Sequence, residues 1–252
     1  MNIFKEFKEQ NTEYITVVRN FYKPMDLCHD EKHFDEVYNE AILLGSWSVL
    51  NGIITLSDYK ILLAAAAYHD VGRSRGDKLH DQFSCDIIDE QHPIARILYQ
   101  QFSYDEIQRV KETIVAHRKK HKAKDEISNI LKDADKISRT DRERSLYRFI
   151  GYNLTNIYVE KFNSIDKFIA ADQEEIKAEV ASRFKEFYNR TKSDECNMHA
   201  HNSKASQAIH HNFADGAVEP PSIEEIKRIY PITVNDLIDK INNNDLYAFT
   251  EE

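Results

Sequence analysis

The sequence predicts an all-α protein, and two observations carry this prediction. Its 252 residues include only six glycines and five prolines, whereas a fold with many β-turns uses both residue types freely. Apolar residues also recur at steps of three and four through much of the chain, which is the period of an amphipathic helix. We therefore expect a helical bundle with additional helices in the C-terminal part of the chain.

Composition restricts the partners and the compartment. A net charge of −9 argues against a surface that binds nucleic acid over a wide area, although a local basic site is compatible with it. The three cysteines are widely separated and odd in number, so they do not form a disulfide framework. The first residues carry charges, and every uncharged run is too short to span a bilayer. We expect a cytoplasmic protein with no membrane partner, and a homo-oligomer is left open.

The first two predicted helices bring a histidine to the core. Residues 3–21 have helical spacing and end before Pro24. In the next helix His33, Val37 and Ala41 recur at steps of four, which puts His33 on the inward face. His29 lies one turn earlier, nearer the helix start, and is expected to be solvated.

The following helix ends in a histidine and an aspartate. Residues 61–68 contain no charge and no proline, which predicts a buried helix capped by Ser57 and ended by Gly72 with a positive φ. His69 and Asp70 leave the core together at its end. A buried carboxylate needs a cation, a strong donor or water close by, and a divalent metal would satisfy both side chains.

Two more helices carry histidines. Asp77 is expected to cap a helix with His80 in its first turn. The sequence S-x-x-E at Ser103 predicts a capping box, and the apolar stripe of the helix that it opens leads to His117.

A later helix carries two aspartates, and the pattern does not choose between them. Asp133 and Asp135 are two residues apart, so on a helix they point about 160° apart and only one can face a given metal. Each lies on a flank of the apolar stripe, so periodicity leaves both open.

The C-terminal part predicts further helices around one polar segment. Residues 152–168 and 173–188 have helical patterns, and capping patterns at Ser222 and Thr233 predict two short terminal helices. Residues 191–221 have few apolar side chains and are expected to form a loop. That stretch contains a histidine-rich set that matches no strong zinc pattern and is expected to be part of the loop: Cys196, His199, His201, His210 and His211.

The ordered set of histidines and aspartates resembles the H…HD…D motif of the HD superfamily of metal-dependent phosphohydrolases, over roughly residues 25–145. The matching segments are HFDEV, AYHDVG and LKDADKIS. The resemblance implies an HD-type domain over residues 1–150, with residues 151–252 as a C-terminal extension. It also selects the aspartate that follows alanine, so the implied metal ligands are His33, His69, Asp70 and Asp135. Looser matches at His80 and His117 imply a second metal or a phosphate contact.

The resemblance implies an enzyme that hydrolyses a phosphate ester or anhydride through a metal-activated water. The mixed histidine and carboxylate ligands suit Mn²⁺, Fe²⁺, Mg²⁺, Co²⁺ or Ni²⁺, with one ion expected and a second left open. Asp70 is expected to orient the water, and Arg73 and Lys136 to contact phosphate. The HD pair lacks the following Glu-Asp that marks hydrolases of guanosine polyphosphate alarmones, and the chain lacks the GYP motif of one class of cyclic-di-GMP phosphodiesterases. The short spacing from the HD pair to His80 and the H…DAD segment resemble small bacterial HD hydrolases of nucleotides. The alternative is a metal-binding sensor or partner-binding module without turnover.

Overall fold

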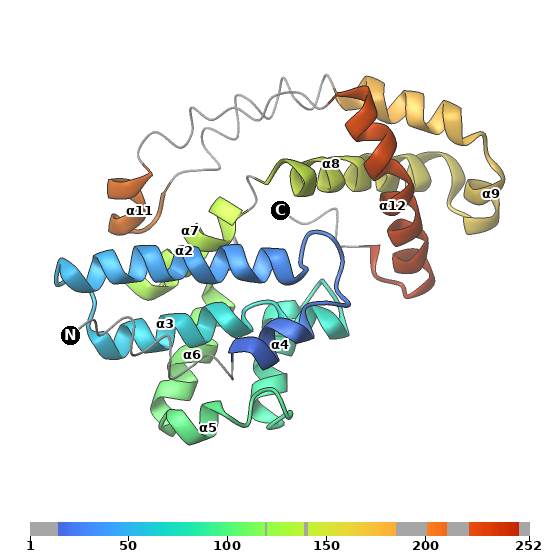
Figure 1. Ribbon diagram of the computed structural model, residues 1–252. Coiled ribbons are helices and arrows are strands. Elements are labelled where there is room, and N and C mark those ends of the chain that lie inside the picture. The colour runs from blue at the N-terminus through green and yellow to red at the C-terminus, as the bar shows by residue number, and fades with distance from the viewer. Residues whose placement is uncertain (1–14, 119, 139–140, 185–200, 211–221, 247–252) are drawn as a thin grey trace. The chain divides into compact units, whose positions relative to one another are not determined.

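The computed structural model describes residues 15–118, 120–138, 141–184, 201–210 and 222–246 (Figure 1). Every secondary-structure element within these ranges is a helix, which confirms the all-α prediction. The chain forms two compact units: residues 1–138 with 201–211, and residues 139–200 with 212–252. Residue 150, the expected domain boundary, lies inside a helix of the second unit. The expected division into residues 1–150 and 151–252 stays a prediction.

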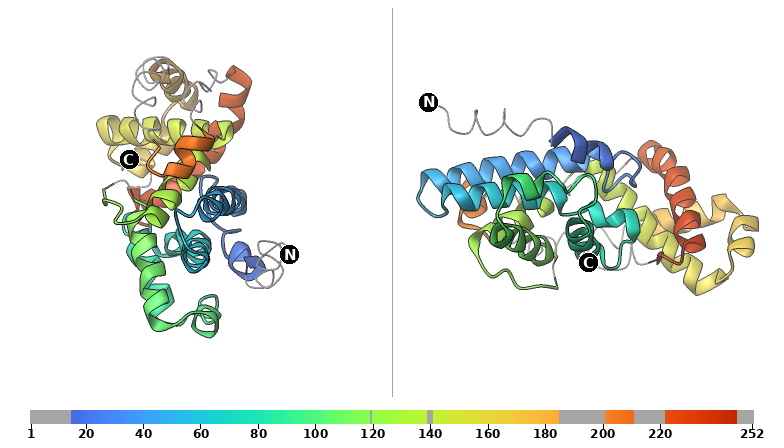
Figure 2. Two further views of the ribbon diagram at one scale, coloured as in Figure 1. Left: turned by 90° about the vertical axis from the view of Figure 1, so that its left-hand side faces the viewer. Right: turned by 90° about the horizontal axis from the view of Figure 1, so that it is seen from below.

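The first unit is a bundle built around two long antiparallel neighbours. Helix α2 (Glu31–Leu50) packs against α3 (Leu56–Tyr68) and α7 (Glu126–Ser138), and α3 also packs against α6 (Tyr104–Ala116). The left-hand view of Figure 2 looks along α2 and α3, which lie next to each other. Shorter elements complete the unit: the 3₁₀ helix η1 (Val71–Arg75), α4 (His80–Asp89), α5 (Leu98–Gln101) and α11 (Lys204–Ile209).

Local capping explains where several helices begin. The expected capping box at Ser103 is present, with the Ser103 side chain accepting from the Glu106 backbone and the Glu106 carboxylate accepting from Ser103 N. Helix α3 begins two residues earlier than predicted, because Thr55 caps it instead of Ser57 and forms a capping box with Asp58. Asp77 does not cap α4, since its carboxylate pairs with Arg73 instead.

Gly72 does not have the predicted positive φ. It lies in η1, where α4 passes so close that a Cβ atom at this position would be 2.1 Å from the His80 carbonyl oxygen and 2.4 Å from Ser84 N. The glycine is therefore needed for this close backbone approach rather than for a left-handed turn.

Part of the expected polar loop is helical. Residues 204–209 form α11, which packs against α2 and α7. Asp133 anchors this segment, because its carboxylate accepts hydrogen bonds from the backbone nitrogens of Asn202 and Ser203 and from Ser203 Oγ. Of the histidine-rich set, His201 bonds to Ser206 and His210 to Glu40, while Cys196, His199 and His211 lie outside the described residues.

The second unit contains α8 (Arg142–Ile157), the π-helix η2 (Tyr158–Phe162), α9 (Ile165–Ala170), a helical stretch at 173–184 and α12 (Ile223–Asn242). The two short terminal helices expected from the capping patterns are one helix, because α12 continues through Pro231. It packs on α8, where Arg142 makes two hydrogen bonds to the Glu225 carboxylate. None of the described helices is long and apolar enough to cross a membrane.

Candidate metal centre

Five helices of the first unit bring six metal-ligating side chains together. They come from α2, the end of α3, the start of α4, the end of α6, and α7, and each is at most 6% exposed: His33, His69, Asp70, His80, His117 and Asp135. We call this set the six-residue cluster.

The cluster has two halves that share one carboxylate. In the first half, His33 Nε2 lies 3.2 Å from His69 Nε2 and 3.6 Å from Asp135 Oδ1. In the second half, His80 Nε2 lies 3.3 Å from His117 Nε2. Asp70 stands between them, with Oδ2 3.4 Å from His33 Nε2 and Oδ1 3.3 Å from His80 Nε2. Each half has the size of a metal site with three ligands.

Hydrogen bonds hold three of the histidines in the tautomer that a metal requires. The Nδ1 atoms of His69, His80 and His117 donate to the carbonyl oxygens of residues 66, 77 and 114. Each proton is therefore on Nδ1, and the Nε2 lone pair points into the cluster.

Ser138 orients the fourth histidine in the same way. Its hydroxyl donates to the Asp135 carbonyl oxygen at 2.7 Å, so the Ser138 oxygen can only accept from His33 Nδ1, 3.1 Å away. The same α7 turn thus presents Asp135 and fixes the ring of His33.

Burial keeps three of the histidines uncharged. Desolvation lowers the pKa of His33 to about 3 and that of His117 to about 4, and it takes the pKa of His80 well below the usual value. Burial alone would raise the pKa of Asp70, but Arg73 and the neighbouring histidines lower it well below its usual range. Near neutral pH, His33, His80 and His117 are therefore neutral imidazoles that face the ionised carboxylate of Asp70.

This donor set fits a divalent cation. Lone pairs of adjacent imidazoles face each other at 3.2 and 3.3 Å, an arrangement that is repulsive unless a cation lies between them. The buried Oδ1 atom of Asp70 accepts no hydrogen bond from the described residues. Both features are those of ligands that share a metal.

The tertiary structure separates the two aspartates of α7. Asp135 faces the six-residue cluster, whereas Asp133 faces α11 and accepts its hydrogen bonds there. Two residues of one helix therefore serve opposite surfaces, as the helical period requires.

Arg73 holds the shared carboxylate. Its Nε lies 2.9 Å from Asp70 Oδ2 and its Nη1 lies 2.6 Å from Asp77 Oδ1, with the side chain 11% exposed. Lys136 is half-buried on α7, next to Asp135 in the chain. The roles expected for both residues as phosphate contacts remain predictions.

Sequence reasoning missed two groups of buried residues near the cluster. His29 was expected to be solvated but is 5% exposed, with Nδ1 2.8 Å from Asp26 Oδ1. His29 precedes Asp30, the N-cap of α2, so helical spacing could not predict its burial. Asp26, His29 and Asp77 could hold an ion by distance, but the guanidinium of Arg73 already neutralises Asp77.

The second group is an ion pair next to the histidines of α4 and α6. Asp81 is fully buried, and its Oδ1 lies 3.0 Å from Arg118 Nη1. The same Arg118 nitrogen donates to the Lys78 carbonyl oxygen. Because Asp81 follows His80 and Arg118 follows His117, this pair links the two ends of chain that carry the second half of the cluster.

One comparison with known proteins gives a match. Residues 40–140 match a family model described as HD domain, a range that includes five members of the cluster and begins seven residues after His33. No curated protein and no solved structure matches the chain significantly.

Proposed function

Because residues 40–140 belong to the HD superfamily, we propose that this protein is a metal-dependent phosphohydrolase. Its proposed substrate is a nucleotide or a related small molecule with a phosphate ester or anhydride. The observation that supports this most directly is the position of Asp70, whose two oxygens face two separate groups of histidines. We place the protein in the cytoplasm, and self-association stays an untested prediction.

Four residues would hold the first ion: His33, His69, Asp70 and Asp135. His80 and His117 would complete a second site with the other oxygen of Asp70, and the two-sided geometry favours this second ion. Imidazole and carboxylate ligands suit Mn²⁺, Fe²⁺, Co²⁺ or Ni²⁺, and Mg²⁺ if carboxylates dominate. When bound, a divalent ion lowers the pKa of coordinated water and polarises the phosphoryl oxygen.

The protein's own side chains would orient the metal ligands and neutralise the charge of the phosphate. The Nδ1 hydrogen bonds keep each imidazole ring from rotating, so the ligand geometry is in place before substrate binds. Arg73 keeps Asp70 ionised and fixes one of its oxygens, which makes it a positioning residue in this proposal. Lys136 would add positive charge for the phosphate from the same helix as Asp135.

Two measurements test the proposal. Elemental analysis of the wild-type protein and of His69→Ala should show that the variant has lost at least one ion per chain, because the first half of the cluster loses a ligand. Hydrolysis of a panel of nucleoside mono-, di- and triphosphates with added Mn²⁺, Co²⁺ or Mg²⁺ should release phosphate or pyrophosphate. Metal-loaded protein that binds nucleotides in calorimetry and hydrolyses none would identify a sensor module and refute the enzyme.

A further inference from the structure

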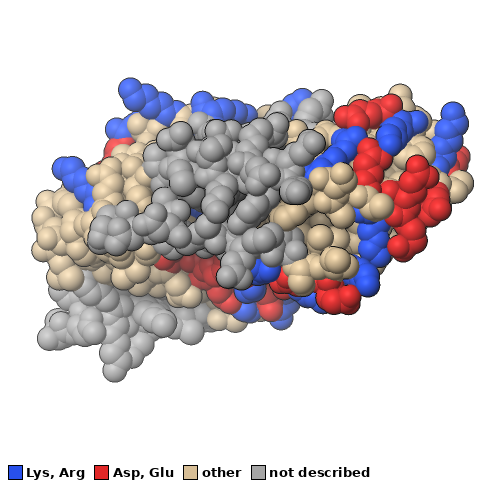
Figure 3. All heavy atoms as spheres, turned by 90° about the horizontal axis from the view of Figure 1, so that it is seen from above, with Lys and Arg blue, Asp and Glu red and all other residues tan. Residues whose placement is uncertain are grey.

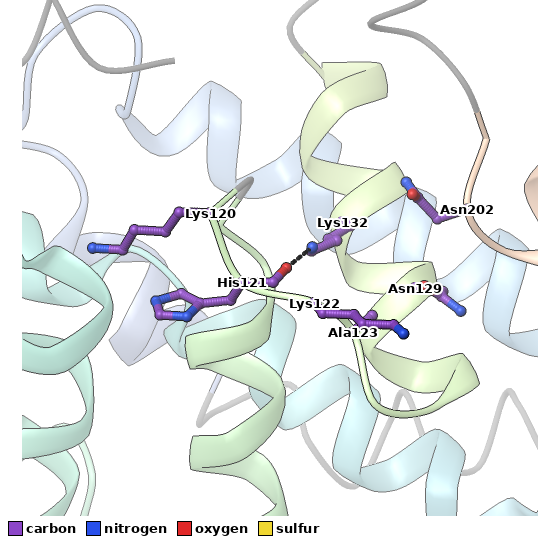
Figure 4. A pocket seen from close by; sticks show the side chains of 7 residues that line it. All are labelled: Lys120, His121, Lys122, Ala123, Asn129, Lys132 and Asn202. Atoms are coloured by element: carbon purple, nitrogen blue, oxygen red, sulfur yellow. Dashed lines mark hydrogen bonds between the residues drawn. The ribbon is translucent and has the colours of Figure 1, made fainter.

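A polar pocket lies beside the loop that joins α6 to α7. It has a volume of about 570 Å³ and is lined by Lys120, His121, Lys122, Ala123, Asn129, Lys132 and Asn202 (Figure 4). Three of these seven residues are lysines and none is acidic, in a chain whose net charge is −9. The pocket is therefore a local positive site of the kind that draws anions to an acidic protein.

The carboxylates nearest the pocket have other partners: Asp133 accepts hydrogen bonds from Asn202 and Ser203, and Asp81 pairs with Arg118. No carboxylate pairs with Lys122 within the described residues. Lys132 is 8% exposed, and its ammonium group donates to the His121 carbonyl oxygen, as the dashed line in Figure 4 marks. Burial, followed by repulsion from Lys136, lowers the pKa of Lys132. An anion in the pocket would relieve this repulsion and add charge-assisted hydrogen bonds.

The pocket and the metal centre are joined by two short stretches of chain. Lys132 precedes Asp135 by three residues on α7, so their Cβ atoms are neighbours about 5–6 Å apart. At the other side, the loop bearing Lys120 and Lys122 follows within five residues of His117, which ends α6. A molecule that reacts at the cluster could therefore extend its remaining charged groups towards the lysines.

We propose that this pocket binds the phosphate groups of the substrate that are not attacked, so that the preferred substrates carry several phosphates in a chain, as nucleoside triphosphates do. The inference rests on the proposed hydrolysis at the six-residue cluster. Lys122 and Lys132 would make the phosphate contacts, and the Asn129 side chain would add a polar group beside them.

Binding can be measured without the metal or the reaction. Inorganic tripolyphosphate is titrated by calorimetry into metal-free protein in EDTA and about 0.1 M NaCl, where charges more than about 10 Å apart are screened. The Lys122→Gln/Lys132→Gln variant should bind it at least about tenfold more weakly, since a hydrogen bond to a charged group is lost at each position. The control is Lys23→Gln/Lys60→Gln, which removes two exposed lysines of the same unit and should bind as the wild type does.

Kinetics of the metal-loaded protein then connect the pocket to the substrate. The pocket variant should raise the KM of a nucleoside triphosphate by a larger factor than that of the corresponding monophosphate, because only the longer chain reaches the lysines. The pocket assignment is overturned if wild-type protein binds no tripolyphosphate, or if both double variants bind it equally. It is also overturned if the two KM values rise by the same factor.

The two proposals fail in different ways. Lysine-dependent tripolyphosphate binding without hydrolysis of any nucleotide would refute the enzyme but leave the phosphate site in place. Hydrolysis of nucleotides, together with tripolyphosphate binding that is unchanged in the Lys122→Gln/Lys132→Gln variant, would refute the phosphate site but leave the enzyme.

Discussion

Replacing Gly72 with alanine should damage both the stability and the second half of the metal centre. The added Cβ would lie 2.1 Å from the His80 carbonyl oxygen, 2.4 Å from Ser84 N and 2.8 Å from the Phe83 carbonyl carbon. All three neighbours are backbone atoms, so no side chain can rotate to make room. Because contacts under 3.0 Å essentially do not occur, α4 and η1 must separate by about 0.9 Å or more.

This movement has an energetic cost and a functional one. Forcing extra volume into a packed backbone contact costs typically about 1–3 kcal/mol, and separation would also weaken the bond from Gly72 N to Ser84 Oγ, worth about 1 kcal/mol. We therefore expect Gly72→Ala to lower the free energy of unfolding by about 2–4 kcal/mol. His80 begins α4, so the same shift moves its Nε2 away from Asp70.

The assay is urea unfolding of metal-free protein, followed by the fluorescence of Trp47, the only tryptophan. Metal content per chain is measured in parallel on protein saturated with Mn²⁺, and the variant should hold fewer ions than the wild type. Gly52→Ala is the control, because Gly52 has φ +66° but no atom within 4 Å of the added Cβ, so only backbone strain of about 1–2 kcal/mol is expected. The reasoning is refuted if Gly72→Ala matches the wild type in both unfolding and metal content.

Three further predictions concern the residues around the cluster. Arg118→Met leaves Asp81 buried without its main partner, so we expect the free energy of unfolding to fall by about 3–5 kcal/mol and the second metal ion to bind more weakly. Arg109→Met, which breaks an exposed pair with Asp58, should cost at most about 1 kcal/mol. Equal costs in urea unfolding would contradict this prediction. Asp133→Ala should release residues 201–210 and speed their cleavage by a protease, while metal content stays unchanged. Asp135→Ala should lower metal content without faster cleavage, and the reverse pattern would show that the two aspartates are wrongly assigned. Metal-free protein should lose stability as the pH falls below about 6.5, because the folded-state pKa values of His33, His80 and His117 lie below the unfolded value and the unfolded chain then binds more protons. Each histidine lowers the free energy of unfolding by up to about 1.4 kcal/mol per pH unit, until the pH reaches its folded-state pKa. Equal unfolding free energies in urea at pH 7.5, 6 and 5 would refute this prediction.

Local sequence signals were sufficient where the responsible interactions are local. The capping box at Ser103 involves residues three apart, and the inward face of His33 follows from its spacing to Val37 and Ala41, so neither depends on the rest of the fold. The all-α class follows from the same periodicity. The start signal at Ser57 was wrong, because Thr55, two residues earlier, forms the capping box of α3 with Asp58.

What the sequence by itself determined is the helical class and the set of imidazoles and carboxylates available for a metal, because residue type and helical period are properties of the chain alone. Only the tertiary structure decided which α7 aspartate faces the cluster, why residue 72 must be glycine, and how Asp70 divides its oxygens between two histidine groups. Each of these depends on the position of a second helix that is distant in the sequence. A helix flank, a glycine and a carboxylate acquire their roles from the atoms that pack against them, and those atoms come from α2, α4, α6 and α11.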